Sequence, residues 1–205
     1  MAARLTRILV FAREPAAGKA KTRLIPALGP DGAARLARVM LGHALIQAAG
    51  ANIGPVELVG DPHPDAWSQP VAGVATSAQV GDNLGERIAG AVEQTLAADE
   101  WAVVTGTDCP GLDAARIAEA GRALDRHEIA IIPATDGGYV LIGCRQFDRS
   151  IFADVDWGKE AVLTATLRNI EALGWSVWQG KPLPDIDEPD DLKHVPRSWL
   201  VGEDR

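Results

Sequence analysis

The sequence contains few of the residues that build disulfide scaffolds or zinc centres. Only two cysteines occur among its 205 residues, Cys109 and Cys144, and they do not form a closely spaced pair. Isolated cysteines favour buried thiols in a reducing compartment over a disulfide framework. The four histidines are scattered along the chain, which gives no support to a zinc site or to a histidine-based triad.

Long hydrophobic runs are also missing. The apolar stretch at 8–12 is far shorter than the hydrophobic region of a signal peptide, and Arg13 ends it. No other run approaches the roughly 20 apolar residues that a transmembrane helix needs. We therefore expect a cytoplasmic protein without a membrane span.

Positive charge is scarce and unevenly spread. The chain has 20 Lys and Arg against 28 Asp and Glu, a formal net charge of −8, which argues against nucleic-acid binding. Six of the basic residues nevertheless fall within residues 1–23, beside a single acid, Glu14. This asymmetry predicts an anionic ligand at the N-terminal end of the chain.

The hydrophobic pattern predicts a single α/β domain over residues 1–205. Hydrophobic residues make up 47% of the chain, which is enough for a sizeable core. Strands are expected at 8–11, 56–59, 101–105, 129–132, 139–142 and 175–178, and helices at 31–49, 84–97, 113–124 and 159–173, with a last helical turn from Pro189. Such alternation is typical of a mostly parallel sheet with helices on both faces. The two strands that flank Asp136 mark the expected break in the parallel order.

The first candidate site is the basic loop at 13–23, directly after the first predicted strand. Open α/β sheets bind ligands beyond the carboxyl ends of their strands. Gly18 allows close approach of the backbone to a phosphate, while Lys21 and Arg23 supply charge and a planar hydrogen-bonding fork. The loop matches neither a Walker A motif nor the glycine pattern of a dinucleotide fold. A solvated basic turn is the alternative interpretation.

The second candidate is Asp108, at the carboxyl end of the predicted strand 101–105. A carboxylate in that position can coordinate Mg²⁺ or Mn²⁺, which in turn bridges phosphate oxygens. The alternative is an aspartate that caps the following helix. Asp113 is better placed for capping, which leaves Asp108 available for a metal.

The third candidate is the acidic segment 185–191. If this segment is extended, Asp185 and Asp187 point to the same side. The alternative is a helix start with Pro189 at its first position and acids in its first turn. Both interpretations can hold together, with Asp190 and Asp191 serving the helix while Asp187 reaches a metal.

The fourth candidate is the glycine pair after Asp136. Gly137 and Gly138 would let backbone amides approach a ligand, although a tight reversal between two strands explains the same residues equally well. Trp157 could stack on a sugar ring, but a core or rim tryptophan is commoner. Gln79, Asp82 and Arg87 surround a glycine-containing turn that either lines the cleft or simply leads into a helix.

Five segments together resemble one family. They are FAREPAAGKAKTRL at 11–24, GDNLGER at 81–87, TDCP at 107–110, DGGYVLIG at 136–143 and DID at 185–187. Their order and number resemble DUF2064, a bacterial family of glycosyltransferase-A-like proteins that includes proteins labelled arsenosugar-biosynthesis glycosyltransferases. The resemblance extends from about residue 7 to residue 192.

The resemblance implies a fold and a set of roles. The implied fold is that of the nucleotide-diphospho-sugar transferases, a doubly wound Rossmann-like sheet with one reversed strand, and the implied cofactor is Mg²⁺ or Mn²⁺. It assigns the metal to Asp108 and Asp187. It assigns nucleotide contacts to Ala12, Arg13, Lys21 and Arg23, and the acceptor side to Asp136, Gly137 and Gly138.

Some residues depart from the pattern of sugar transferases. Those enzymes commonly carry Asp-x-Asp at the metal strand, whereas Asp108 is followed by Cys109 and Pro110, which is more similar to nucleotidyltransferases. The KTRL segment at 21–24 likewise resembles guanylyltransferases that activate phospholactate. Relatives often place Thr where this chain has Glu188, so Asp187 becomes the expected cap of the last helical turn.

Three functions follow as hypotheses. The first is a metal-dependent glycosyltransferase with a nucleotide-diphospho-sugar donor and a small-molecule acceptor, in which Asp136 is the candidate acceptor base. The second is a nucleotidyltransferase that joins a nucleoside triphosphate to a phosphorylated acceptor and releases pyrophosphate. The third is a nucleotide-binding protein that catalyses nothing.

Overall fold

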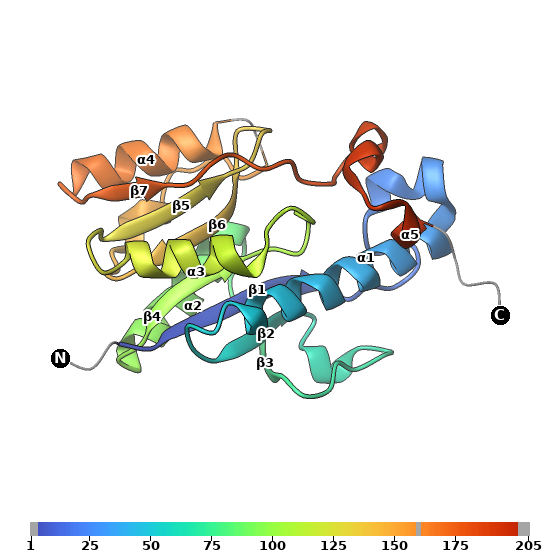
Figure 1. The fold of residues 1–205 in the computed structure, drawn as a ribbon, viewed down its shortest axis with the longest axis horizontal. Coiled ribbons are helices and arrows are strands. Elements are labelled where there is room, and N and C mark those ends of the chain that lie inside the picture. Colours follow the sequence, from blue (N-terminus) through green and yellow to red (C-terminus); the bar gives the residue numbers. More distant parts are fainter. Residues whose placement is uncertain (1–3, 159–160, 201–205) are drawn as a thin grey trace.

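The computed structural model describes residues 4–158 and 161–200, which are built around one seven-stranded sheet (Figure 1). The strands are β1 (Thr6–Arg13), β2 (Val56–Asp61), β3 (Ala75–Ala78), β4 (Trp101–Thr105), β5 (Ile129–Pro133), β6 (Tyr139–Cys144) and β7 (Val177–Gln179). Their order across the sheet is β3-β2-β1-β4-β6-β5-β7. The α/β class predicted from the sequence is confirmed.

One strand runs against the others. β6 pairs antiparallel with both β4 and β5, while the remaining neighbours pair parallel. The reversal occurs at the turn that contains Asp136, where the sequence predicted it. The sheet therefore has the single reversed strand that the family resemblance implies.

Helices cover both faces of the sheet. They are α1 (Ile25–Gly50), α2 (Leu84–Ala97), α3 (Ala114–Ala123), α4 (Val162–Ala172) and the short α5 (Arg197–Leu200). Side chains of β1 alternate between the faces: Ile8 and Val10 join a core with α1 and α3, whereas Leu9 and Phe11 join a core with α2 and α4. Figure 1 shows α1 and α3 on the near side of the sheet. No helix in the described ranges is long and apolar enough to cross a membrane.

The structure corrects several predicted boundaries. α1 includes one turn before the predicted start, and Gly29 breaks the helix there with φ 69° and ψ 166°. β3 was not predicted, because its four residues lack an apolar alternation. The proline-rich stretch after β2, for which the sequence predicted no helix or strand, contains one 3₁₀ turn at Pro64–Ala66. The predicted start of α4 at 159–160 lies outside the described residues.

The C-terminal segment packs on the outside of α1. After β7 the chain forms a 3₁₀ helix at Pro189–His194 and then α5. A third core, separate from the two beside the sheet, joins this segment to the start of α1 through buried residues such as Leu24, Leu36 and Ile186. Figure 1 shows both at the carboxyl end of β1. This core anchors the segment beside the basic loop.

Candidate functional site

The candidate site lies where β1 and β4 end. Val10 of β1 pairs with Thr105, the last residue of β4, so β1 extends three residues further to Arg13. The loop that follows β4 therefore begins beside residues 11–13. This register brings the basic loop and Asp108, which are 85 or more residues apart in sequence, to one edge of the sheet.

The basic loop is held in a defined conformation. Lys21 has φ 47° and ψ 46°, the left-handed region that a residue with a side chain adopts at a cost, and such residues cluster at functional sites. Gly18 also has a positive φ of 75°. The Arg38 guanidinium of α1 donates to the Pro15 carbonyl at 3.1 Å. These contacts fix the loop that the sequence predicted as a phosphate-binding candidate.

Glu14 connects the basic loop to the proline-rich loop at 62–70. Its carboxylate accepts a hydrogen bond from the Ser68 amide at 2.8 Å and lies 3.5 Å from the Lys19 ammonium. The Ser68 hydrogen bonds, with a smaller contribution from Lys19, lower the pKa of Glu14. The acid that the sequence left without a role thus supports the loop.

Lys21 and Asp108 form an ion pair at the centre of the site. The Lys21 ammonium lies 2.9 Å from Asp108 Oδ1, and it also donates to the Ile186 carbonyl. The Lys21 side chain is only 7% exposed, whereas that of Asp108 is 49% exposed. The Thr107 hydroxyl donates to the same Asp108 oxygen at 3.1 Å. The predicted phosphate-binding and metal-binding residues are therefore brought into direct contact.

Arg23 and Asp187 form a second pair between the same two segments. The Arg23 guanidinium binds Asp187 and lies 3.3 Å from Glu188. The prediction that Asp187 caps the last helical turn is wrong: the cap is Glu188, which forms a capping box with Asp191. The Asp191 carboxylate instead accepts from the Asp187 and Glu188 amides. The Asp191 amide donates to the Glu188 backbone carbonyl at 2.9 Å, so the turn begins at Glu188 without a Thr hydroxyl.

A continuation of the sheet edge carries Asp185 and Asp187 to this place. Leu183 pairs with Ala134 beyond the end of β5, and the Ile186 amide then donates to the Asp108 carbonyl at 2.8 Å. The chain therefore crosses from the end of β5 to the end of β4. The role of the Ile186 backbone was missed, because no side-chain pattern signals a carbonyl that binds Lys21.

Two cavities meet at these ion pairs. The larger one, here called the basic cavity, has a volume of about 670 Å³ and is lined by five basic side chains: Arg13, Lys19, Lys21, Arg23 and Arg87. The second, here called the acidic cavity, has a volume of about 370 Å³ and is lined by four carboxylates: Asp108, Asp136, Asp185 and Asp187. Asp108, Asp187 and Arg23 line both cavities. The two metal-binding candidates thus stand between regions of opposite charge.

The wall of the basic cavity includes a network that the sequence indicated in part. Gln79 donates to the Ala12 and Val59 carbonyls at 3.0 Å. Arg87 forms an ion pair with Asp61 at 2.8 Å and donates to the Gly81 carbonyl at 3.0 Å. Asp61 was not predicted, because it reads as the end of a strand. The network places the start of α2 beside Ala12 and the basic loop.

The acidic cavity holds an electrostatic conflict. Burial, together with the negative charges of Asp136, Asp108 and Asp187, raises the pKa of Asp185. The Asp136 carboxylate accepts from the Gly138 amide at 2.9 Å, so the glycine pair forms a tight reversal that also faces the cavity. Cys109 is half-buried and its burial raises the pKa of its thiol to about 11, whereas Cys144 is buried as predicted. A cation would relieve the repulsion among these carboxylates.

The donor set fits a metal that arrives with phosphate. No group of three or more His, Cys, Asp or Glu side chains within 4–158 and 161–200 is arranged to hold a metal ion. Mg²⁺ is commonly held by one or two carboxylates together with substrate phosphates. Asp108 and Asp187 supply such carboxylates, and their present partners are Lys21 and Arg23 of the basic loop. The residues therefore fit a metal–nucleotide complex better than a metal alone.

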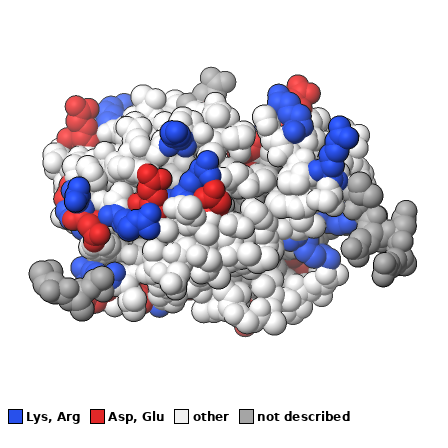
Figure 2. Space-filling model, viewed as in Figure 1, with Lys and Arg blue, Asp and Glu red and all other residues white. Residues whose placement is uncertain are grey.

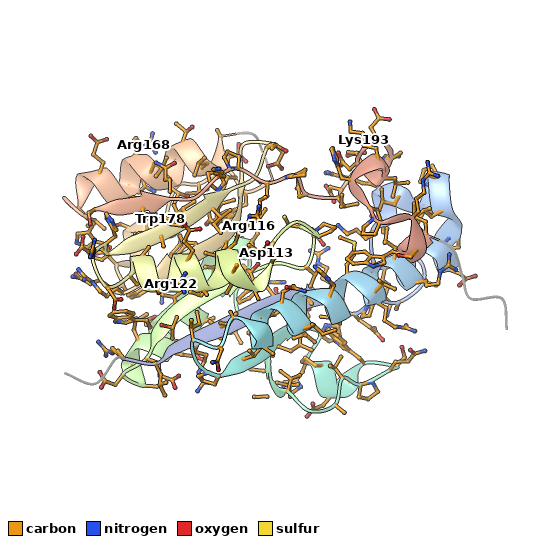
Figure 3. The ribbon with its side chains drawn as sticks, in the orientation of Figure 1. Asp113, Arg116, Arg122, Arg168, Trp178 and Lys193 are labelled. Atoms are coloured by element: carbon orange, nitrogen blue, oxygen red, sulfur yellow. The ribbon has the colours of Figure 1, made fainter. Side chains whose placement is uncertain are left out.

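Figure 2 shows one face of the molecule. It carries scattered charges of both signs around a largely uncharged centre. Asp113 and Arg116 lie together at the start of α3 (Figure 3), where the Asp113 carboxylate accepts from the Arg116 amide at 2.9 Å. The predicted capping role of Asp113 is confirmed, which leaves Asp108 in the site.

Comparisons with known proteins agree with the fold and identify the family. The family model described as an uncharacterized protein conserved in bacteria (DUF2064) matches residues 44–159. A protein from Desulfovibrio desulfuricans G20, described provisionally as a nucleotide-diphospho-sugar transferase, is 30% identical, with a TM-score of 0.83 over 93% of this chain and 86% of its own. No curated protein matches significantly.

Two more distant solved structures share the fold alone. Rv0371c from Mycobacterium tuberculosis H37Rv, solved in complex with manganese, is 16% identical, with a TM-score of 0.54 over 96% of this chain and 100% of its own. A CMP:2-keto-3-deoxy-manno-octonic acid synthetase complexed with CTP is 11% identical, with a TM-score of 0.54 over 93% and 96%.

Proposed function

The chain belongs to the DUF2064 family and has the fold of the nucleotide-diphospho-sugar transferases, and from this premise we propose that it is a cytoplasmic, metal-dependent glycosyltransferase with a nucleotide-diphospho-sugar donor. The observation that carries the proposal is the junction of two oppositely charged cavities at Asp108 and Asp187. The polyanionic diphosphate of a donor matches the basic cavity in charge, and the acidic cavity beside it suits an uncharged acceptor that offers hydroxyl groups.

The basic cavity is the proposed nucleotide site. Lys21 and Arg23 bind the diphosphate, with Arg13 at the mouth and Gly18 allowing close approach of the backbone. These cations offset the negative charge that develops on the leaving diphosphate as the bond to the sugar breaks. Ala12 lies against the Gln79 amide at the base of this cavity and contributes backbone contacts.

Asp108 and Asp187 would hold Mg²⁺ or Mn²⁺, as the carboxylates shared by the two cavities. When bound, the ion would add positive charge beside the diphosphate. The manganese complex of Rv0371c supports the choice of Mn²⁺ for a first test.

The acidic cavity is the proposed acceptor site. Asp136 accepts the proton of the attacking hydroxyl, and the Gly137–Gly138 turn keeps its carboxylate in place through the Gly138 amide. An anionic nucleophile would need cations to bind it, and this cavity offers no basic side chain except Arg23 among its described lining residues. An uncharged hydroxyl group is therefore the expected nucleophile. Arg23 is already engaged by Asp187 and Glu188.

A panel of nucleotide-diphospho-sugars tests the proposal. Each would be added with Mn²⁺ or Mg²⁺ while the melting temperature and the release of nucleoside diphosphate are measured. We expect at least one donor to raise the melting temperature and to be turned over. Lys21→Ala should remove both effects, and Asp108→Ala should abolish turnover together with the metal-dependent part of the stabilisation. Lys181→Ala, which changes an exposed lysine away from both cavities, should alter neither. Absence of binding and of turnover for every donor with either metal would refute the proposal.

A nucleotidyltransferase is the second candidate. It is supported by five basic side chains in the basic cavity, by the lone Asp108 followed by Pro110, and by the CTP-bound synthetase of the same fold. The acidic cavity counts against a phosphorylated acceptor, because four carboxylates would repel it. Pyrophosphate release from triphosphates with phosphorylated acceptors would favour this candidate. Tight nucleotide binding that is unaffected by chelator or by Asp108→Ala would instead favour a non-catalytic binding protein.

A further inference from the structure

Trp157 forms part of the wall of the acidic cavity, so this wall is not entirely polar. Its indole packs on the start of α2 at Gly85, where an added Cβ would come within 2.4 Å of the indole nitrogen. The Tyr139 ring meets it edge-on, with ring centroids 6.3 Å apart and an interplanar angle of 83°. The indole is therefore fixed on two sides, while part of it remains at the cavity.

The rest of the cavity combines apolar and acidic side chains. The apolar and aromatic lining residues include Phe11, Leu84, Ile142, Tyr139 and Trp157. The four carboxylates line the same cavity. An aromatic ring beside carboxylates matches a sugar ring, because one face of the sugar presents C–H groups and its edge presents hydroxyl donors. A phosphate in the same place would face carboxylates with no unpaired described cation to bind it.

The size of the cavity agrees with such a ligand. Its volume of about 370 Å³ lies near the lower end of the range for small-molecule sites, which runs from roughly 300 to 1,000 Å³. A monosaccharide or a short glycoside fits this space.

We propose that the acidic cavity binds an unphosphorylated sugar as the acceptor, with Trp157 stacking on its ring and Asp136 and Asp185 accepting hydrogen bonds from its hydroxyls. This inference rests on the proposed function for the identity of the reaction and adds the chemical class of the acceptor. Trp157 and Asp185 thereby become specificity-determining residues. The four carboxylates of the cavity would repel a phosphorylated sugar, so the discrimination needs no contact outside the acidic cavity.

Binding of a matched ligand panel tests the inference without turnover. Saturation-transfer NMR and calorimetry would compare neutral methyl hexosides with the corresponding hexose 6-phosphates, with nucleoside diphosphate and Mn²⁺ present. We expect a neutral glycoside to bind at least about tenfold more tightly than its phosphorylated counterpart, with saturation transfer concentrated on one face of its ring. Equal or tighter binding of the phosphorylated sugars would overturn the inference.

Variants separate stacking from charge. Trp157→Ala should weaken glycoside binding about tenfold and Trp157→Phe less, whereas Trp178→Phe on β7, outside both cavities, should leave binding unchanged (Figure 3). Asp185→Asn should narrow the preference for neutral over phosphorylated sugars. If Trp157→Ala unfolds the chain, Trp157→Phe and the ligand ratio of the unmodified protein still decide the question. Unchanged glycoside affinity in Trp157→Phe and in Trp157→Ala would exclude the stacking role.

The outcome is distinguishable from failure of the proposed function. If glycosides bind but no nucleotide-diphospho-sugar does, the reaction is wrong and the sugar site stands. If donors bind and are hydrolysed while only phosphorylated sugars occupy the cavity, the reaction stands and the acceptor class is wrong.

Discussion

At the scale of single residues, the site consists of charges that already satisfy one another. Lys21 is paired with Asp108, and Arg23 with Asp187. A phosphate ligand would bind Lys21 and Arg23 and so release the two carboxylates for a metal. A metal would bind Asp108 and Asp187 and so release the two cations for phosphate. Binding of nucleotide and metal should therefore be thermodynamically coupled, with each raising the affinity for the other by the same factor.

Asp108→Asn tests this coupling. The substitution removes the carboxylate that occupies Lys21 and repels phosphate, so the affinity for nucleoside diphosphate without metal should rise about fivefold, or roughly 1 kcal/mol. The gain in affinity on adding Mn²⁺ should be lost. Calorimetric titrations with Mn²⁺ and with EDTA measure both effects. Asp125→Asn, an exposed aspartate outside the site, is the matched control. A variant that weakens nucleotide binding without metal would contradict the exchange of partners.

The absence of a side chain at Gly85 leaves room for the indole of Trp157. An added Cβ would overlap Trp157, so Gly85→Ala should displace the indole, lower the stability by about 1–3 kcal/mol and weaken acceptor binding. Nucleotide affinity should change little, because Gly85 does not line the basic cavity.

Gly90→Ala is the matched control for this substitution. Gly90 lies in the same helix, and an added Cβ there would meet only the Val80 carbonyl at 3.9 Å. This variant should therefore gain up to about 1 kcal/mol from helix propensity. Urea unfolding of the two variants, together with glycoside titrations, measures the difference. Similar effects of both substitutions would exclude the packing argument.

At the scale of elements, predictability followed the strength of the local pattern. α2 and β4 were predicted with the observed bounds, because their apolar spacing is regular and Asn83 caps the start of the helix. β3 was missed, since it has only four residues and its pairing with β2 is a long-range contact. The site shows the same division. Lys21, Asp108 and Asp187 are visible as charged residues at strand ends, whereas their pairing and the Ile186 carbonyl depend on tertiary structure.

The C-terminal segment is the element that joins the third core to the site. Ile186 is fully buried beside Leu24, its amide binds the Asp108 carbonyl and its carbonyl binds Lys21. Ile186→Ala should release this segment and cost about 2–5 kcal/mol of local stability. We therefore expect weaker nucleotide binding and faster amide exchange in the 183–200 region, measured by calorimetry and hydrogen exchange.

Ile170→Ala provides the contrast. Ile170 is equally buried but belongs to α4 and to the core on the opposite face of the sheet. Its truncation should lower the global free energy of unfolding while leaving nucleotide affinity intact. If Ile186→Ala also changes only global stability, the segment does not support the site.

At the scale of the whole molecule, the two ends of the strands have different roles. The carboxyl ends of β1 and β4 carry the site, while the opposite end is closed by polar contacts. Glu128, just before β5, accepts from the Ser176 amide at 2.9 Å and from its hydroxyl at 2.7 Å, and it pairs with Arg145 after β6. One carboxylate thus joins the starts of β5 and β7 to the end of β6.

These contacts should make stability depend on pH. The Ser176 hydrogen bonds, with Arg145 adding to them, lower the pKa of Glu128 to about 2. Because the pKa is lower in the folded chain than in the unfolded chain, the native state binds fewer protons. The stabilisation is therefore present above about pH 5 and is lost as the pH falls toward 2. Urea unfolding across this range should show the free energy of unfolding decreasing with acidity.

Glu128→Gln isolates this contribution. An amide cannot titrate and accepts weaker hydrogen bonds, so the variant should be less stable than the unmodified chain at pH 7 and should approach it near pH 2. Asp148, whose pKa is also lowered by the hydroxyl and amide of Ser150, lies in an exposed turn, and Asp148→Asn should have a much smaller effect. A constant difference between Glu128→Gln and the unmodified chain at every pH would mean that packing, and not the charge of Glu128, joins the three strands. Because this edge lies away from both cavities, nucleotide affinity at neutral pH should be the same in all three proteins.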